Sequence, residues 1–144
     1  NEMLDESFEK IYRAFRLEYY KHFFSVLRER AGSLSAAEIS SVEVIYLLNE
    51  PTMKEFADYI DISPPNATYK VKSLVEKGYL KKIPTEDGRE FRLRVTDQFR
   101  RYYSDDASYG KFILSKMQER LSPEEIGEVS KIIALLDEKV FQGD

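Results

Sequence analysis

The sequence has no cysteine, one histidine, six glycines and five prolines among 144 residues. Without cysteine there is no disulfide, thiolate metal site or thiol redox sensor, and the single histidine, His22, leaves little for a metal cluster or a serine–histidine pair. No apolar run approaches the ~20 residues of a membrane span, and no signal-peptide core is recognisable. We therefore expect no cofactor, no metal, no catalytic residues and no membrane contact, and we favour a cytoplasmic binding protein over an enzyme.

Charge is distributed unevenly along the chain. The net charge is −4, from 22 Lys and Arg against 26 Asp and Glu. Residues 68–101 hold ten basic and five acidic side chains, so this segment carries 10 − 5 = +5 and the remainder carries −4 − 5 = −9. An acidic chain with one basic segment is typical of a nucleic-acid-binding protein, although a solvated charged surface would give the same count.

The spacing of apolar residues predicts helices before the basic segment. From about residue 5 to residue 30, apolar side chains recur every three or four positions, which indicates a long helix with one apolar stripe, ended at Gly32. Capping-box patterns beginning at Ser35 and Thr52 predict a second and a third helix. Ser63, followed by proline, predicts the start of a fourth helix that ends at Gly78. The third and fourth helices, joined by a tight turn, form a predicted helix-turn-helix.

After the fourth helix the pattern becomes alternating. Residues 79–83 read as a short strand, and Asp-Gly at 87–88 is a strong turn signal. In residues 89–96 apolar positions (Phe91, Leu93, Val95) alternate with charged ones, which predicts a half-buried strand. The pair forms a β-hairpin wing behind the helix-turn-helix.

The chain is expected to be helical again from Asp97, with a last helix capped at Ser122. Its apolar residues step by 3, 4, 3 and 4 positions, a short heptad seam that favours an oligomer contact; they are Ile126, Val129, Ile133, Leu136 and Val140. We expect residues 1–34 and 98–144 to form a helical dimerisation region and residues 35–97 a winged helix-turn-helix, all within one compact domain.

The exposed face of the fourth helix carries side chains that can contact bases or phosphates. An ordinary amphipathic surface helix is the alternative, but the preceding turn and the following wing favour a recognition helix. The candidate DNA-binding residues on or beside it are Ser63, Pro65, Asn66, Thr68, Tyr69, Lys70, Lys72 and Ser73. On the wing they are Lys82, Asp87 and Arg89.

Several short motifs resemble those of the MarR (multiple antibiotic resistance regulator) transcription factors. Leu74-Val75-Glu76-Lys77-Gly78-Tyr79-Leu80 is similar to the family's exit from the recognition helix, and Thr68 matches a recurrent threonine six residues earlier. Asp87-Gly88-Arg89 matches the Asp-x-Arg wing motif, and Val95-Thr96 the pair that closes the wing. The resemblance implies a homodimeric regulator, most often a repressor, that binds a pseudo-palindromic operator in double-stranded DNA. It also implies that Arg89 enters the minor groove and is steadied by Asp87.

Two questions stay open at this stage. The ten tyrosines and nine phenylalanines could line a pocket for a small aromatic or acidic ligand, whose place beside the dimer region is implied by the resemblance, or could fill the dimer core. A winged helix used for protein–protein contact without DNA is the alternative function. The basic segment and Arg89 at the wing tip argue against it.

Overall fold

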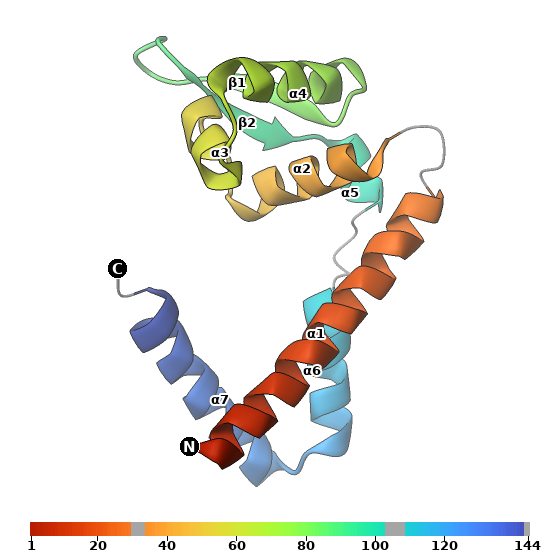
Figure 1. Ribbon diagram of the computed structural model, residues 1–144, viewed down its shortest axis with the longest axis vertical. Coiled ribbons are helices and arrows are strands. Elements are labelled where there is room, and N and C mark those ends of the chain that lie inside the picture. Colours follow the sequence, from red (N-terminus) through yellow and green to blue (C-terminus); the bar gives the residue numbers. More distant parts are fainter. Residues whose placement is uncertain (30–33, 103–108, 143–144) are drawn as a thin grey trace. The chain divides into compact units, whose positions relative to one another are not determined.

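The computed structural model describes residues 1–29, 34–102 and 109–142. The chain divides into two compact units, Asn1–Ser104 and Asp105–Asp144. In the described residues it is mainly helical, with a two-stranded antiparallel sheet (Figure 1). The predicted class, mainly α with a β-hairpin wing, is confirmed. No helix in the described part of the chain is long and apolar enough to cross a membrane.

In its described residues the first unit contains five helices and the hairpin. In chain order the elements are α1 (Glu2–Glu29), α2 (Ala36–Leu47), α3 (Met53–Ile60), α4 (Pro64–Glu76), β1 (Leu80–Pro84), β2 (Phe91–Val95) and α5 (Asp97–Tyr102). The strands pair in register from Leu80 opposite Val95 to Pro84 opposite Phe91. The loop joining them extends away from the helices (Figure 1).

The predicted helix starts are confirmed by their hydrogen bonds. The Ser35 hydroxyl accepts from the Glu38 N–H at 3.2 Å, and the Glu38 carboxylate accepts from the Ser35 N–H at 3.0 Å. Thr52 and Ser122 make the same reciprocal pair with the glutamate three residues later. Ser63 Oγ accepts from the Asn66 N–H at 3.3 Å at the start of α4. Each cap satisfies backbone donors that the first helical turn cannot satisfy itself.

The core of the first unit lies between α2, α3, α4 and the hairpin. One face of α4 is committed to it, as the spacing predicts, because Ala67, Val71 and Leu74 are fully or almost fully buried. The last turns of α1 also reach this core. The other buried apolar residues are Val26, Leu34, Ile39, Val42, Ile45, Phe56, Ala57, Tyr79, Leu80, Leu93, Val95 and Phe99.

The exit from α4 is fixed by Gly78 and Thr96. Gly78 has a φ of 86°, a left-handed conformation that favours glycine at the end of a helix. Its carbonyl accepts from Thr96 Oγ1 at 2.6 Å, and the Tyr79 carbonyl accepts from the Thr96 N–H at 3.2 Å. Thr96 Oγ1 also accepts from the N–H of Phe99 at 3.4 Å, inside the first turn of α5. One threonine therefore joins the end of α4, the end of β2 and the start of α5.

Phe91 is an exception to the predicted inward face of β2. Leu93 is 0% and Val95 6% exposed, whereas Phe91 is 39% exposed. Phe91 lies at the end of the hairpin nearest the turn, opposite Pro84, with the Lys82 ammonium 5.0 Å from its ring centroid. The expectation that Phe91 is held in the core is therefore wrong.

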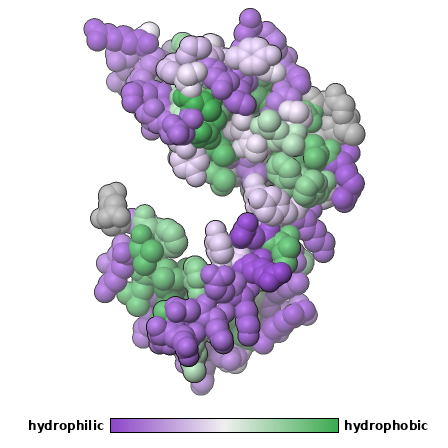
Figure 2. Space-filling model, in the orientation of Figure 1, coloured by the Kyte–Doolittle hydropathy of each residue, from purple (hydrophilic) through white to green (hydrophobic). Residues whose placement is uncertain are grey.

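The second unit contains α6 (Tyr109–Arg120), α7 (Pro123–Leu136) and a π-helical turn, η2 (Asp137–Phe141). Several apolar side chains here are about half exposed, and they gather on α7 in Figure 2. They include Ile133, Leu136 and Val140 of the predicted seam. The predicted seam requires α-helical spacing along its whole length. Val140 lies in the π-helical turn, where side chains are spaced differently, so it does not continue the line of the other seam residues. The predicted helix end at Gly32 lies outside the described residues.

Candidate nucleic-acid interface

The outer face of α4 is exposed along its first half. Ser63, Pro65, Asn66, Thr68 and Lys72 are exposed. Tyr69 is 75% exposed, far more than a tyrosine held by packing. Thr68 Oγ1 donates to the Pro64 carbonyl at 3.0 Å, so its hydrogen is used within the helix and its oxygen keeps both lone pairs as acceptors. The predicted recognition-helix residues at these positions therefore share one accessible surface.

Ser73 does not lie on that surface. It is half-buried, and its hydroxyl donates to Glu38 Oε2 on α2 at 3.0 Å. The expectation that Ser73 belongs to the exposed face is wrong, because the helical phase turns this position toward α2. Lys70, expected beside the exposed face, is also half-buried.

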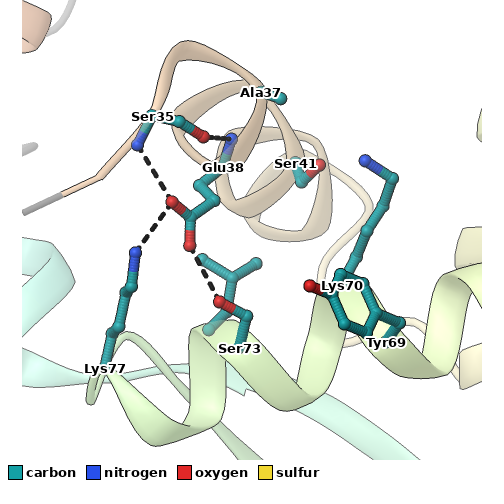
Figure 3. Close-up of a pocket in the computed structure, with 9 residues that line it drawn as sticks. Ser35, Ala37, Glu38, Ser41, Tyr69, Lys70, Ser73 and Lys77 are labelled. Atoms are coloured by element: carbon teal, nitrogen blue, oxygen red, sulfur yellow. Dashed lines mark hydrogen bonds and ion pairs between the residues drawn. The ribbon is translucent and has the colours of Figure 1, made fainter.

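Glu38 connects the first turn of α2 with the last turns of α4 (Figure 3). Besides its capping bond, its carboxylate accepts from Ser73 and from the Lys77 ammonium at 2.9 Å. Burial alone would raise the pKa of Glu38, but the hydrogen bonds from Ser35, Lys77 and Ser73 outweigh it and lower the pKa to about 2. The capping-box pattern predicts only the local bond. The contact with Lys77 spans 39 residues of sequence and has no local signal.

A cleft of about 280 Å³ lies beside this carboxylate, between α2 and α4. Lys70, Tyr69 and the nearly buried Ser41 line it together with Glu38 and Lys77 (Figure 3). The cleft therefore adjoins the Tyr69 side of the recognition helix.

The wing turn is built around Asp87. Its Oδ1 accepts from the Thr85 hydroxyl at 2.8 Å and from the Arg89 backbone N–H at 3.1 Å. The bond from the Arg89 N–H, followed by that from Thr85, lowers the pKa of Asp87. Gly88, between them, has a φ of 70°. Within the described residues no ion pair joins Asp87 to the Arg89 guanidinium. Asp87 thus shapes the main chain that carries Arg89, through the backbone and not through the guanidinium.

A second groove, of about 560 Å³, separates the wing from the start of α4 and from α3. Thr68 on α4 and Lys82 and Arg89 on the wing all line it. Three predicted site residues from separate elements are thus brought to one concave surface.

Four of the ten cations in the basic segment are paired with carboxylates. Lys77 binds Glu38, and Arg100 binds Asp97 at 3.1 Å. Arg92 lies 3.5 Å from a carboxylate oxygen of Glu55, and Arg94 lies 2.7 Å from one of Glu50. Among the described residues, the cations of this segment that form no ion pair are Lys70, Lys72, Lys81, Lys82, Arg89 and Arg101. The free positive charge thus comes mainly from α4 and the wing.

Comparison with known proteins identifies the type of fold. Residues 34–90, which include α2, α3, α4 and the first half of the wing, match the model of the MarR family. The resemblance to that family, first indicated by the helix exit and the Asp-x-Arg wing, is therefore confirmed. A search of curated proteins found no match to the chain.

Solved structures share the fold over almost the whole chain. A MarR family protein from Bacillus stearothermophilus superposes with a TM-score of 0.68 at 15% identity, covering 99% of both chains. Streptococcus pneumoniae FabT in complex with DNA has a TM-score of 0.60 at 18% identity, covering 95% of this chain and 94% of FabT. Staphylococcus aureus MarR in complex with salicylate and kanamycin has a TM-score of 0.59 at 18% identity, with coverages of 99% and 96%. At these identities the likeness establishes the fold.

Proposed function

We propose that this chain is a sequence-specific DNA-binding transcriptional regulator of the MarR family. The observation that carries the proposal is the groove in which Thr68 of α4 faces Lys82 and Arg89 of the wing. A helix with exposed Asn66 and Tyr69 suits the major groove, where base edges are distinguishable. An arginine at a hairpin tip suits the narrow minor groove, whose negative potential favours it. The DNA complex of the structural neighbour FabT supports the same use of the fold.

The proposed active form is a homodimer acting in the cytoplasm. The apolar residues along the first half of α1 and on α7 are exposed in a single chain; Phe8 is 61%, Ile11 57% and Ile133 51% exposed. Contiguous apolar surface of this kind is normally covered by a partner. A two-fold dimer would place two α4 helices in successive major grooves of a pseudo-palindrome, about 34–36 Å apart.

The regulator is proposed to be a repressor that a small aromatic or acidic ligand releases from DNA. The salicylate complex of the neighbouring Staphylococcus aureus MarR supports a ligand of this class. A ligand changes DNA affinity only by binding one arrangement of the two recognition helices better than another.

Selection of bound sequences from a pool of random duplexes tests the proposal. We expect a two-fold symmetric consensus, with affinity that falls steeply as salt rises on both selected and generic DNA. A matched Arg89→Ala protein serves as the control for wing-dependent selection. If no duplex sequence is enriched and the affinity for DNA does not change with salt, the alternative is favoured, which is a winged helix used only for protein contact.

A further inference from the structure

The basic residues of β2 are held by the segment that joins α2 to α3. We propose that Glu50 is a positioning residue that fixes the wing against the helix-turn-helix and withholds Arg92 and Arg94 from DNA. The effect of Glu50 on DNA binding rests on the proposed function, whereas its contacts with Arg92 and Arg94 are those of the free protein.

The backbone of residues 49–52 is specialised for this contact. Asn49 and Glu50 have φ values of 57° and 59°, a left-handed conformation that non-glycine residues keep only where their surroundings hold them. The next two residues supply that support. The Pro51 carbonyl accepts from the Leu93 N–H at 2.8 Å, and Thr52 forms an antiparallel bridge with the residue opposite it on β2. The segment thus adds a short third edge to the hairpin.

Glu50 binds two successive outward-facing cations of β2. Its backbone carbonyl accepts from Arg92 Nη1 at 3.0 Å, and its Oε1 accepts from Arg94 Nε at 2.7 Å. Arg92 and Arg94 are two residues apart on a strand, so their side chains emerge on the same face. Glu55, in the first turn of α3, adds a longer contact with Arg92 at 3.5 Å. The helix-turn-helix therefore holds one face of the wing strand at two points.

A small tilt of β2 at its contact with Glu50 would produce a larger displacement at the wing tip. Arg94 and Arg89 are five positions apart, the last two of them in the turn beyond β2, so the lever is at most about 16 Å at ~3.3 Å per residue. A tilt of about 10° at the base would move Arg89 by about 3 Å, which is enough to remove a hydrogen bond that requires 2.7–3.2 Å. The position of Arg89 relative to α4 thus depends on how firmly Glu50 holds β2.

The alternative is an ordinary surface ion pair. The side chains of Arg94 and Glu50 are 42% and 40% exposed, and exposed pairs contribute little to folding stability. The two interpretations predict opposite signs for DNA binding. If only charge matters, replacing the Glu50 side chain removes a negative charge, frees the Arg94 guanidinium and tightens binding to any DNA. If Glu50 positions the wing, the contribution of Arg89 is lost.

The first experiment measures affinity for the selected duplex with wild type, Glu50→Ala, Arg89→Ala and the double variant. Asp97→Asn is the charge control, because it removes one negative charge from an exposed pair with Arg100. We expect Arg89→Ala to cost about tenfold in the wild-type and Asp97→Asn backgrounds and less than about threefold in Glu50→Ala, which lacks the oxygen that accepts from Arg94. An equal cost in all three backgrounds would overturn the proposal.

The second experiment needs no DNA. Amide hydrogen exchange reports the bond from the Leu93 N–H to Pro51, which the Glu50 contacts reinforce. We expect exchange at Leu93 to be at least about tenfold faster in Glu50→Ala than in wild type or Asp97→Asn, with the α4 amides unchanged. If exchange changes in this way but the wild type selects no DNA, the anchor stands and the proposed function fails. If exchange at Leu93 is unchanged, the anchor itself is refuted.

Discussion

The Ser73 hydroxyl donates to Glu38 across 3.0 Å, which joins the second half of α4 to the first turn of α2. The same carboxylate also receives the Lys77 ammonium and the Ser35 N–H. A residue that looks like a base-reading serine in the sequence is therefore part of the scaffold that holds the recognition helix.

This arrangement predicts an acid-sensitive contribution to stability. The pKa of Glu38 is lowered to about 2, below the ordinary value of 4.5 that it regains on unfolding. A depressed carboxyl pKa stabilises the folded state above the unfolded pKa, and this stabilisation is lost as the pH falls from 4.5 through 2. We expect the free energy of unfolding to decline over that range by about 2–3 kcal/mol more in wild type than in Glu38→Gln. Urea unfolding at pH 6, 4 and 2 measures this, and parallel profiles for the two proteins would contradict it.

We propose that the exposed half of α4 reads the bases. Replacing Asn66 or Tyr69 with alanine should cost ~1–3 kcal/mol on the selected duplex and much less on generic DNA. Ser73→Ala is a useful comparison, since this hydroxyl is turned toward Glu38 and should change both affinities equally. Titration by fluorescence anisotropy on both duplexes measures the ratio. Equal losses for Asn66 or Tyr69 on both would mean that these side chains only position the helix.

The wing turn gives a separate prediction. Arg89→Ala should weaken binding to the selected duplex by at least about tenfold while leaving folding unchanged. Asp87→Ala should also weaken it, although it removes a negative charge, because the Arg89 N–H and the Thr85 hydroxyl lose their acceptor. Asp87→Asn keeps an acceptor oxygen and should retain most of the affinity. Tighter binding by Asp87→Ala would show that the turn geometry is irrelevant.

Assembly can be tested through the exposed apolar surfaces. Ile133→Glu on α7 and Phe8→Glu on α1 should each shift the protein toward monomer, because a charge in a buried apolar interface is costly. Lys131→Glu, a charge change at an exposed position on α7, is the control. Sedimentation velocity at micromolar concentration measures the effect. A wild-type protein that sediments as a stable folded monomer would refute the proposed dimer.

The parts of the fold that follow from local chemistry are predictable from the sequence. The caps at Ser35, Thr52, Ser63 and Ser122 depend on residues within three positions, and each lies where the pattern predicts. The buried face of α4 follows from its helical period in the same way.

The errors concern contacts that a local pattern cannot contain. Ser73 turns inward because Glu38, 35 residues away, receives its hydroxyl. Phe91 continues the alternation of β2 but lies where the hairpin has passed beyond the helices, so its neighbour is Lys82 instead of the core. The link between Glu50 and Arg94 spans 44 residues. It depends on the left-handed conformation of Asn49 and Glu50, which cannot be predicted from these residue types because neither is glycine.

The bonds of Thr96 have a mechanical consequence. Because one side chain ties the Gly78 carbonyl to the first turn of α5, and Phe99 of that turn is 1% exposed, α4 has no hinge at its exit. A displacement of α5 would therefore be transmitted first to the Gly78–Tyr79 junction between α4 and β1, at the opposite end of the wing from Arg89.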